Sequence, residues 1–357
     1  MERSVGLLGV ASYLPPETRH NDWWPAATAE RWLRERSTAR PPAHGAITPA
    51  MARVLAAMAE QAIDPFQGVV ERRVMPRDMT AVDMEVRAAE RAIAHARIDR
   101  REIDLLLTHT AVPEYLLSNT ACVLHRALDL APDCFAMQAE ASGHSFLMQL
   151  TLAEDAIARG RARYALLVQS SAASRLLDRE DPQSPLFGDG AAAVVVGPVP
   201  RGGLLATVHR TDGTHPRALI ACVRDGRWYD GDRIVLHRGD LSAARQVFLE
   251  TADRAIEVVG AALDKAGHAP ADVEFFAVHQ GTPWLRRVTQ ESTGLSRARC
   301  VDTFATTGYL FAASIPLVLE TAQRQGLLPP DSLVVMHGGG VGSTYGANVM
   351  RWGAAVA

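Results

Sequence analysis

The chain is poor in cysteine and aromatic residues and has no large surplus of one charge. Its four cysteines, Cys122, Cys134, Cys222 and Cys300, show neither C-x-x-C nor metal-ligand spacing. We therefore expect free thiols, no bound metal, and a reducing, cytoplasmic compartment. The formal net charge is -3, from 37 basic and 40 acidic side chains, so no nucleic-acid partner is expected.

Long hydrophobic runs are also lacking. No segment reaches the roughly 18 to 20 apolar residues of a membrane-spanning helix, so no membrane partner is expected. The N-terminus enters a short apolar run at residues 5–10 without the basic and long apolar regions of a secretory signal. Hydrophobic residues nevertheless make up 48% of the chain, which is enough for a large buried core and excludes a disordered protein.

Short apolar runs alternate with helix-length segments along the chain. Alternation of this kind predicts an α/β fold in which helices cover sheets. Strands are predicted at residues 5–10, 103–107, 164–168, 191–196, 275–278 and 333–336, and helices at residues 81–96, 146–159, 244–266 and 312–325.

An internal repeat relates the two parts of the chain by a shift of 170 positions. Residues 92–109 realign with residues 262–279, so that His109 falls on His279. Further along, the helix after Ala141 corresponds to the helix after Gly308. A duplicated α/β half is the simplest explanation of these correspondences.

The repeat predicts two halves, residues 1–198 and 199–357. One region interrupts the first half, at about residues 23–66, and it is rich in Pro, Ala and Arg apart from a helical stretch at 52–63. This insertion is either a surface loop without chemistry or a lid or partner-docking element, as long connections in compact domains often are.

Glycine-containing motifs with reactive side chains fall at the predicted carboxyl ends of strands, where α/β folds gather their sites. His279 directly follows a strand, and it is either a proton-transfer residue or a structural histidine. The run Gly338, Gly339 and Gly340 could offer backbone N–H groups to an oxyanion or could form a tight turn. The motifs are AEASGHS at 139–145, AVHQGTP at 277–283 and MHGGGVGSTYG at 336–346, with FGDGAAAVVVG nearby at 187–197.

Six motifs, taken in order, resemble the ketoacyl synthase III branch of the thiolase superfamily and its acyltransferase relatives. They are GLLGVASYLPP, EIDLLLTHT, FGDGAAAVVVG, HQGT, GYLFAASIPLVLE and GGGVGSTYGANVMRW. The resemblance implies a thiolase-like five-layered α-β-α-β-α fold and a homodimer. It also implies an acyl-pantetheine thioester as substrate, supplied by an acyl carrier protein or coenzyme A, and no cofactor.

The resemblance places Ala141 at the position of the family's nucleophilic cysteine, at the start of a central helix, and His279 at that of the family histidine. Alanine has no nucleophilic atom, so the usual acyl-thioester cannot form there. Three explanations stay open: a Cys-to-Ala inactivation, Ser142 as a substitute nucleophile, or a protein without a covalent step. Neighbouring side chains on a helix diverge by about 100°, which disfavours Ser142.

Tyr309 is a second departure, because the family has asparagine there. In condensing relatives the asparagine and the histidine polarise a malonyl thioester for decarboxylation. A phenol donates one hydrogen bond and is bulkier, so condensation is disfavoured. Acyl transfer needs less: His279 as general base for a hydroxyl or amine, and Gly338 to Gly340 as oxyanion donors.

The predicted function is therefore an acyltransferase acting on a natural-product acceptor, here in an inactivated Cys-to-Ala form. The alternatives are a condensing ketoacyl synthase III and a non-catalytic thiolase-fold binding partner. Further cleft candidates are His144, Gln280 and His337. Docking of an acidic carrier protein would need basic residues, for which the candidates are Arg34, Arg36, Arg40, Arg286 and Arg287.

Overall fold

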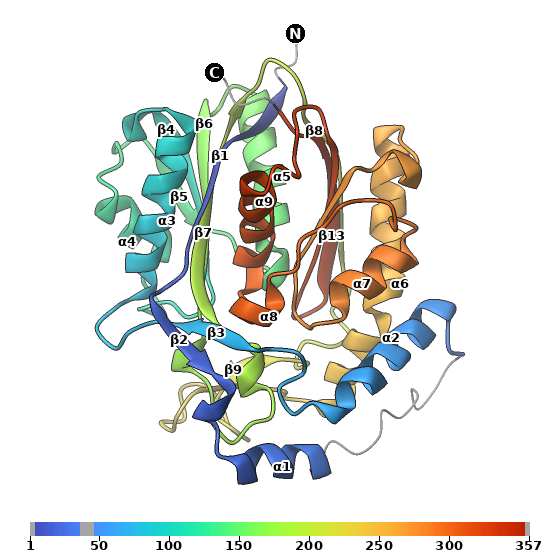
Figure 1. Cartoon of the computed structure of the whole chain (residues 1–357). Coiled ribbons are helices and arrows are strands. Elements are labelled where there is room, and N and C mark those ends of the chain that lie inside the picture. Colours follow the sequence, from blue (N-terminus) through green and yellow to red (C-terminus); the bar gives the residue numbers. More distant parts are fainter. Residues whose placement is uncertain (1–3, 36–45, 354–357) are drawn as a thin grey trace.

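The computed structural model describes residues 4–35 and 46–353, which form two large mixed sheets (Figure 1). The first sheet has the strand order β1-β7-β6-β4-β5, and the second has the order β11-β12-β13-β8. All six strands predicted from apolar runs are confirmed, mostly with a few added residues. These six are β1 Val5–Tyr13, β4 Ile103–Thr110, β6 Tyr164–Ala172, β7 Asp189–Pro198, β11 Phe275–Val278 and β12 Leu333–Gly340. The two sheets also contain β5 Phe135–Gln138, β8 Gly203–Thr211 and β13 Thr344–Arg351, which were not predicted.

The four predicted helices are also confirmed. The helix predicted at 81–96 has the predicted bounds, because Thr80 and Asp83 form a capping box at its start. The last one begins later than predicted, since a 3-10 turn at Phe311–Ala313 precedes it. The helices are α1 Ala26–Glu35, α2 Pro49–Glu60, α3 Ala81–Ala96, α4 Thr120–Ala127, α5 Ser145–Ala158, α6 Leu241–Ala266, α7 Leu285–Ser292, α8 Phe304–Thr307 and α9 Ser314–Arg324.

Three hydrophobic clusters stack these elements into five layers. One cluster joins α3 and α4 to the outer face of the first sheet. A second fills the space between the sheets with α5 and α9, through residues such as Phe146 and Val318. A third packs α6 on the outer face of the second sheet. The expected α-β-α-β-α order is thereby confirmed (Figure 1).

The repeated segments occupy equivalent places in the two sheets. α3 and β4 come from the first copy, α6 and β11 from the second, and each helix covers the outer face of its own sheet. The chain passes from the first sheet to the second between Pro198 and Gly203. The division into halves at residue 198 stays a prediction.

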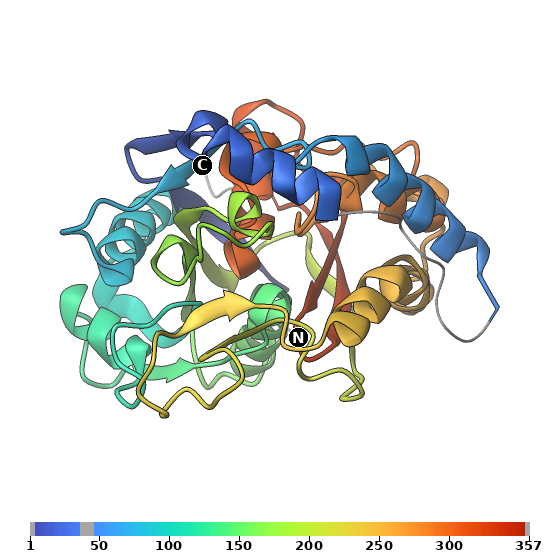
Figure 2. The same ribbon diagram turned by 90° about the horizontal axis from the view of Figure 1, so that it is seen from below.

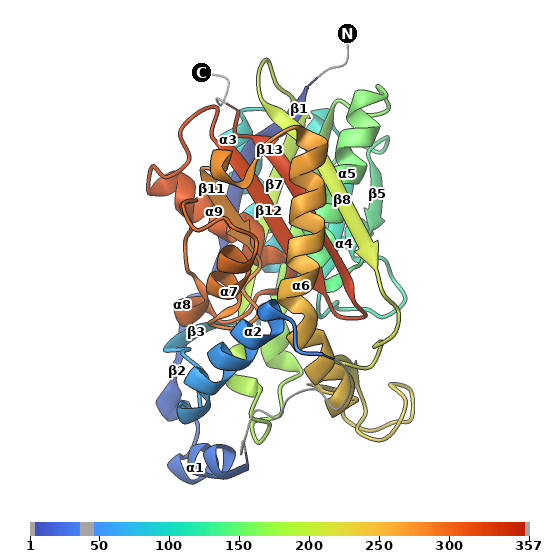
Figure 3. The same ribbon diagram turned by 90° about the vertical axis from the view of Figure 1, so that its right-hand side faces the viewer.

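The insertion of residues 23–66 forms α1, α2 and a 3-10 turn at Gln61–Ile63. α2 packs on α6 and α7, with Val54 fully buried in the shared cluster (Figure 3). α1 is anchored by Trp32, whose ring meets those of Trp24 and Phe66. Arg36 and Arg40 lie outside the described residues.

Short strands complete one end of the molecule. β2 (Glu17–His20) pairs with β3 (Glu71–Val74), and β9 (Ile220–Cys222) pairs with β10 (Val235–His237). Seen from below in Figure 2, α1 and α2 run along one side of this end, and the segment of β9 and β10 crosses the other. The cavities described next lie beneath these covering segments.

Candidate active site

Four segments that lie far apart in the sequence converge at this end of the sheets. A Cβ added to Gly143 would collide with Tyr309 Oη, and it would lie 2.5 Å from the carbonyl oxygen of Gly339 and 3.5 Å from Cδ2 of His279. A Cβ on Gly340 would overlap the carbonyl oxygen of Ala141. Glycine at 143 and 340 therefore permits the close approach that assembles the site.

His279 follows β11 and is held from two directions. Its backbone N–H donates to His337 O at 3.1 Å, and its Nδ1 accepts the N–H of Gly339 at 3.2 Å. Since an amide N–H can only donate, the proton of the neutral imidazole is on Nε2. Burial, with His337 nearby, lowers the pKa of His279 to about 3, so the ring is neutral at physiological pH.

This arrangement corrects two roles predicted from the sequence. His279 presents an N–H donor and not a free lone pair, so the general-base role does not fit the structure. The N–H of Gly339 already donates to His279 Nδ1, so the assignment of Gly339 as an oxyanion donor is wrong. The glycine run is also no turn: Gly338, Gly339 and Gly340 are the last residues of β12 and pair with β13. For Gly338 and Gly340 the oxyanion role stays a prediction.

Tyr309 lies beside His279, with ring centroids 6.0 Å apart, and packs on Phe311 at 4.7 Å and Phe187 at 5.9 Å. Burial, and the nearby carboxylate of Glu140, raise the pKa of Tyr309, so the phenol keeps its proton. The position of the family asparagine is thus occupied by a neutral O–H donor on a wide aromatic ring.

Both donors line a largely apolar cavity of about 940 Å³, counted with its open mouth. His337 also faces it; its Nδ1–H donates to Gly346 O at 3.0 Å, and burial lowers its pKa to about 4. The apolar wall includes Leu186, Phe187, Val247, Phe248 and Leu285. A thioester with an apolar acyl chain suits such a lining.

Ala141 precedes a 3-10 turn, Ser142–His144, that leads into α5. Its backbone N–H donates to Ser145 Oγ at 2.8 Å. Ser142 has φ 51°, in the left-handed region, so it is not a helical residue. The argument against Ser142 from side-chain divergence on a helix therefore does not apply.

Ser142 faces a second cavity of about 510 Å³ that sequence reasoning missed. His109 and Glu140 line it too, and the two cavities share Leu219 and Val341 in their walls. His109 Nδ1 lies 2.5 Å from Glu140 Oε2, while Glu140 Oε1 accepts the N–H of Ser142 at 2.7 Å. The internal repeat was the available signal, because it aligns His109 with His279.

Two further candidates are structural in this arrangement. Gln280 uses its amide on backbone groups: Nε2 donates to Val301 O at 2.7 Å, and Oε1 accepts the N–H of Thr303 at 2.8 Å. His144 lies 2.9 Å from His209 through Nε2 and Nδ1, and it lines neither cavity. Burial, with His209 and other histidines nearby, lowers its pKa to about 3.

The arginines considered for carrier docking are already paired within the chain. Arg286 Nε lies 2.7 Å from Asp302, and Arg287 Nη2 lies 2.6 Å from Glu60 on α2. Arg34 lies 4.0 Å from Glu30 on its own helix. Their role in docking stays a prediction.

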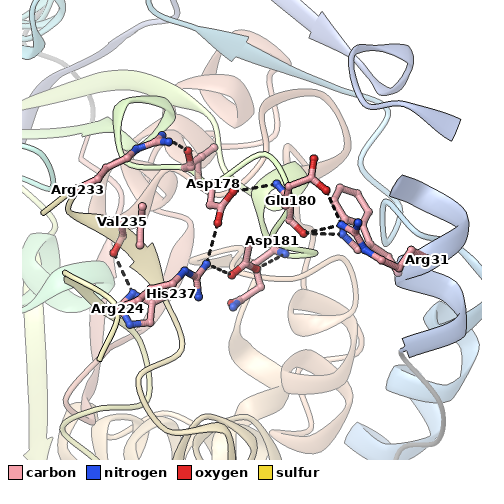
Figure 4. A network of polar contacts seen from close by, with 11 residues as sticks. Arg31, Asp178, Glu180, Asp181, Arg224, Arg233, Val235 and His237 are labelled. Atoms are coloured by element: carbon pink, nitrogen blue, oxygen red, sulfur yellow. Dashed lines mark hydrogen bonds and ion pairs between the residues drawn. The ribbon is translucent and has the colours of Figure 1, made fainter. Parts of the chain in front are cut away.

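A network of ion pairs ties the covering segments together (Figure 4). Arg31 of α1 binds Glu180 at 2.6 Å, and Arg224, in the segment between β9 and β10, binds Asp178 at 3.1 Å and Asp181 at 3.2 Å. Leu236 of β10 adds a backbone N–H bond to Leu176 O at 2.9 Å. These segments supply Leu176, Gln183, Leu219 and Leu236 to the walls of the two cavities.

Residues 4–35 and 46–353 contain neither a candidate membrane-spanning helix nor a candidate metal-ligand cluster. No helix in these ranges is both long and apolar enough to cross a bilayer. Across the same part of the chain, no cluster of three His, Cys, Asp or Glu side chains is arranged to hold a metal ion. The four cysteines are free.

The fold and this site define a thiolase-fold protein in which a histidine and a tyrosine, both hydrogen-bond donors, line an apolar cavity. The family model described as 3-oxoacyl-[acyl-carrier-protein (ACP)] synthase III matches residues 135–213, and its C-terminal counterpart matches residues 263–352. The chain is a ketoacyl synthase III-like protein of the thiolase superfamily, whose enzymes transfer or condense acyl groups.

Solved structures support this assignment. The 3-oxoacyl-(acyl carrier protein) synthase III of Pseudomonas aeruginosa is 26% identical, with 99% of this chain and 100% of that chain covered and a TM-score of 0.78. The enzyme of the same name from Aquifex aeolicus is 25% identical over 98% and 100%, also at 0.78. OleA of Xanthomonas campestris, 20% identical over 99% and 100% with a TM-score of 0.76, shares the fold.

Proposed function

We propose that this protein transfers an acyl group from an acyl carrier protein or coenzyme A thioester to a hydroxyl or amine of a natural-product acceptor. One observation carries the proposal: His279, whose proton is on Nε2, and the protonated Tyr309 line the same apolar cavity. Two donors that converge on a thioester carbonyl would stabilise the negative charge that develops on its oxygen.

The histidine is suited to this role because it stays neutral and its tautomer is fixed. Gly339 N–H holds Nδ1 as an acceptor, so Nε2–H points away from that bond. Tyr309 stays protonated, since burial raises its pKa. Neither group removes a proton from the acceptor, so a hydroxyl or amine must give its proton to another group.

We further propose that the covalent step of the family is blocked at position 141, where alanine stands. To test this, Ala141→Cys is incubated with acyl-carrier and coenzyme A thioesters, and intact mass is recorded. We expect an added acyl mass on the new cysteine, which is lost when an alcohol or amine is supplied. The double variant Ala141→Cys/Tyr309→Phe, a matched control that keeps the ring, should acylate at least about 10²-fold more slowly.

Condensation is the second candidate, because the family relatives at 25% and 26% identity are 3-oxoacyl synthases. The ring of Tyr309 packs between His279 and Phe311 and leaves less space for a malonyl group, which disfavours condensation. Loss of the acyl group only with malonyl thioester, with release of carbon dioxide, would favour condensation. Failure of every thioester to acylate Ala141→Cys would favour a non-catalytic binding partner.

We also propose a homodimer. β5 ends the first sheet, and exposed apolar side chains lie on it and in the loop between β4 and α4. Tyr115, Leu116, Leu117 and Phe135 have exposed fractions of 57%, 69%, 99% and 63%. An unpaired strand edge with such neighbours favours pairing with a second copy. A monomeric mass in light scattering at micromolar concentration would contradict this assignment.

A further inference from the structure

The second cavity holds a histidine and a carboxylate that the proposed acyl transfer does not use. Burial raises the pKa of Glu140, but the hydrogen bonds from His109 and from the N–H of Ser142 outweigh this effect and hold it below its usual value. The carboxylate is therefore ionised and can only accept, so the 2.5 Å contact places a proton on His109 Nδ1. In the neutral form of this ring, Nε2 carries the lone pair. It is buried and has no hydrogen-bond partner within the described ranges.

A hydroxyl with no partner faces the same cavity. Ser142 is 6% exposed, and its Oγ is buried and makes no hydrogen bond in the part of the chain that the structure describes. Its φ of 51° puts it on a sharp turn between β5 and α5. Nucleophile elbows use such a turn to expose a serine, with the next backbone N–H, here that of Gly143, available to an oxyanion.

The duplication of the chain explains why a second set of groups exists. His109 is the repeat partner of His279: His109 is the second-to-last residue of β4, and His279 directly follows the equivalent strand β11. Ser142 and Phe311 both have φ 51°, and both open the 3-10 turn that leads into a central helix, α5 or α9. Each half therefore supplies one histidine and one turn, and the two half-sites meet at Leu219 and Val341.

We propose that Ser142 is the nucleophile of this chain as it stands, with His109 as its general base and Glu140 orienting the imidazole. Ser142 Oγ attacks the thioester carbonyl while its proton moves to His109 Nε2. The new C–O bond forms, the C–S bond breaks, and His109 returns the proton to the departing thiolate. An acceptor hydroxyl or amine then attacks the serine ester and gives its proton to His109, which passes this proton to Ser142 Oγ as the ester C–O bond breaks. The thioester donor rests on the proposed function, whereas the activated serine does not.

A fluorophosphonate tests the serine without knowledge of the acyl group, because it reacts with activated serines by forming an O–P bond and expelling fluoride. We expect the wild-type protein to gain one phosphonyl mass, mapped to the peptide of Ser142. Ser142→Gly should abolish the label, and glycine accepts the positive φ there, so the fold should persist. His109→Gln should slow labelling by about 10²-fold or more. Ser118→Ala, at an exposed serine, should leave labelling unchanged.

Each contrary outcome overturns the inference. These outcomes are no labelling of the folded wild-type protein under conditions that label a serine esterase, a label on another serine, or an unchanged rate in His109→Gln. Circular dichroism and melting temperature establish that each variant is folded. If the wild-type protein transfers acyl groups but resists the fluorophosphonate, the proposed acyltransferase stands and only Ser142 is excluded. Labelling without thioester turnover would exclude the proposed donor and keep the serine.

Discussion

Acidification should destabilise this protein through the histidines around its site. In the folded chain the pKa values of His144, His279 and His337 are lowered to about 3, about 3 and about 4. The unfolded chain binds protons at these positions below pH ~6.5, so the free energy of unfolding falls as pH drops from about 6.5 toward 4. At pH 5 each imidazole accounts for a loss of about 2 kcal/mol, or about 6 kcal/mol for the three.

Glu85 opposes this loss. It is fully buried in α3, accepts hydrogen bonds from Thr110 and Ser170, and has a pKa that burial raises to about 7. The folded state therefore takes up this proton first, and stability rises by about 2 kcal/mol between pH 7.5 and pH 5. The pKa of His209 is lowered, which adds to the loss of stability on acidification. The pKa of Asp189 is raised, which adds to the opposing gain. The net expectation is a loss on the order of 4 kcal/mol, a large part of a typical domain's stability.

Urea unfolding at pH 7.5 and pH 5.0 measures this difference directly. Glu85→Gln should enlarge it by about 2 kcal/mol, and His144→Gln should reduce it by about the same amount. His20→Gln, at a histidine whose side chain is 58% exposed, should leave it unchanged. Equal stability of the wild-type protein at the two pH values, or an unchanged difference in His144→Gln, would refute the reasoning.

Three substitutions test the packing and the donors of the site. Gly143→Ala should cost about 1–3 kcal/mol in urea unfolding, because the new methyl group would collide with Tyr309 Oη and the backbone of Gly339; wild-type stability would mean that this close approach is not required. Gly260→Ala, in the middle of α6 with nothing within 4 Å, should instead stabilise by about 0.5–1 kcal/mol in the same assay. In the Ala141→Cys background, Tyr309→Phe should lower thioester turnover by about 10²-fold with little change in melting temperature, and an unchanged rate would remove the phenol from the donor pair.

The strands and helices could be predicted because the chain repeats one pattern of burial. The central strands are buried on both faces, so they read as continuous apolar runs, and α3 carries its own start signal at Thr80 and Asp83. The start of α9 was displaced because Phe311 adopts a positive φ, which no apolar pattern reveals. The glycine run was interpreted as either an oxyanion site or a tight turn, and its place at the end of β12 was missed, since its pairing with β13 is a contact between strands and leaves no local signal.

The site was predictable in position and not in chemistry. His279, Tyr309 and Ala141 were located by their motifs, and the structure brings their segments together. The tautomer of His279 depends on the N–H of Gly339, 60 positions away, and spacing does not show such a bond. His109 was visible through the repeat, but its pairing with Glu140 requires coordinates.

The middle layer bears on how a chain of this kind could arise. α5 comes from one copy of the repeat and α9 from the other, and both helices are buried between the two sheets. A single copy would therefore leave one face of its central helix exposed to solvent. An ancestor of half the length would have needed to form a homodimer to bury that helix. The two copies now differ in chemistry, since one places an imidazole beside a phenol and the other places an imidazole beside a carboxylate.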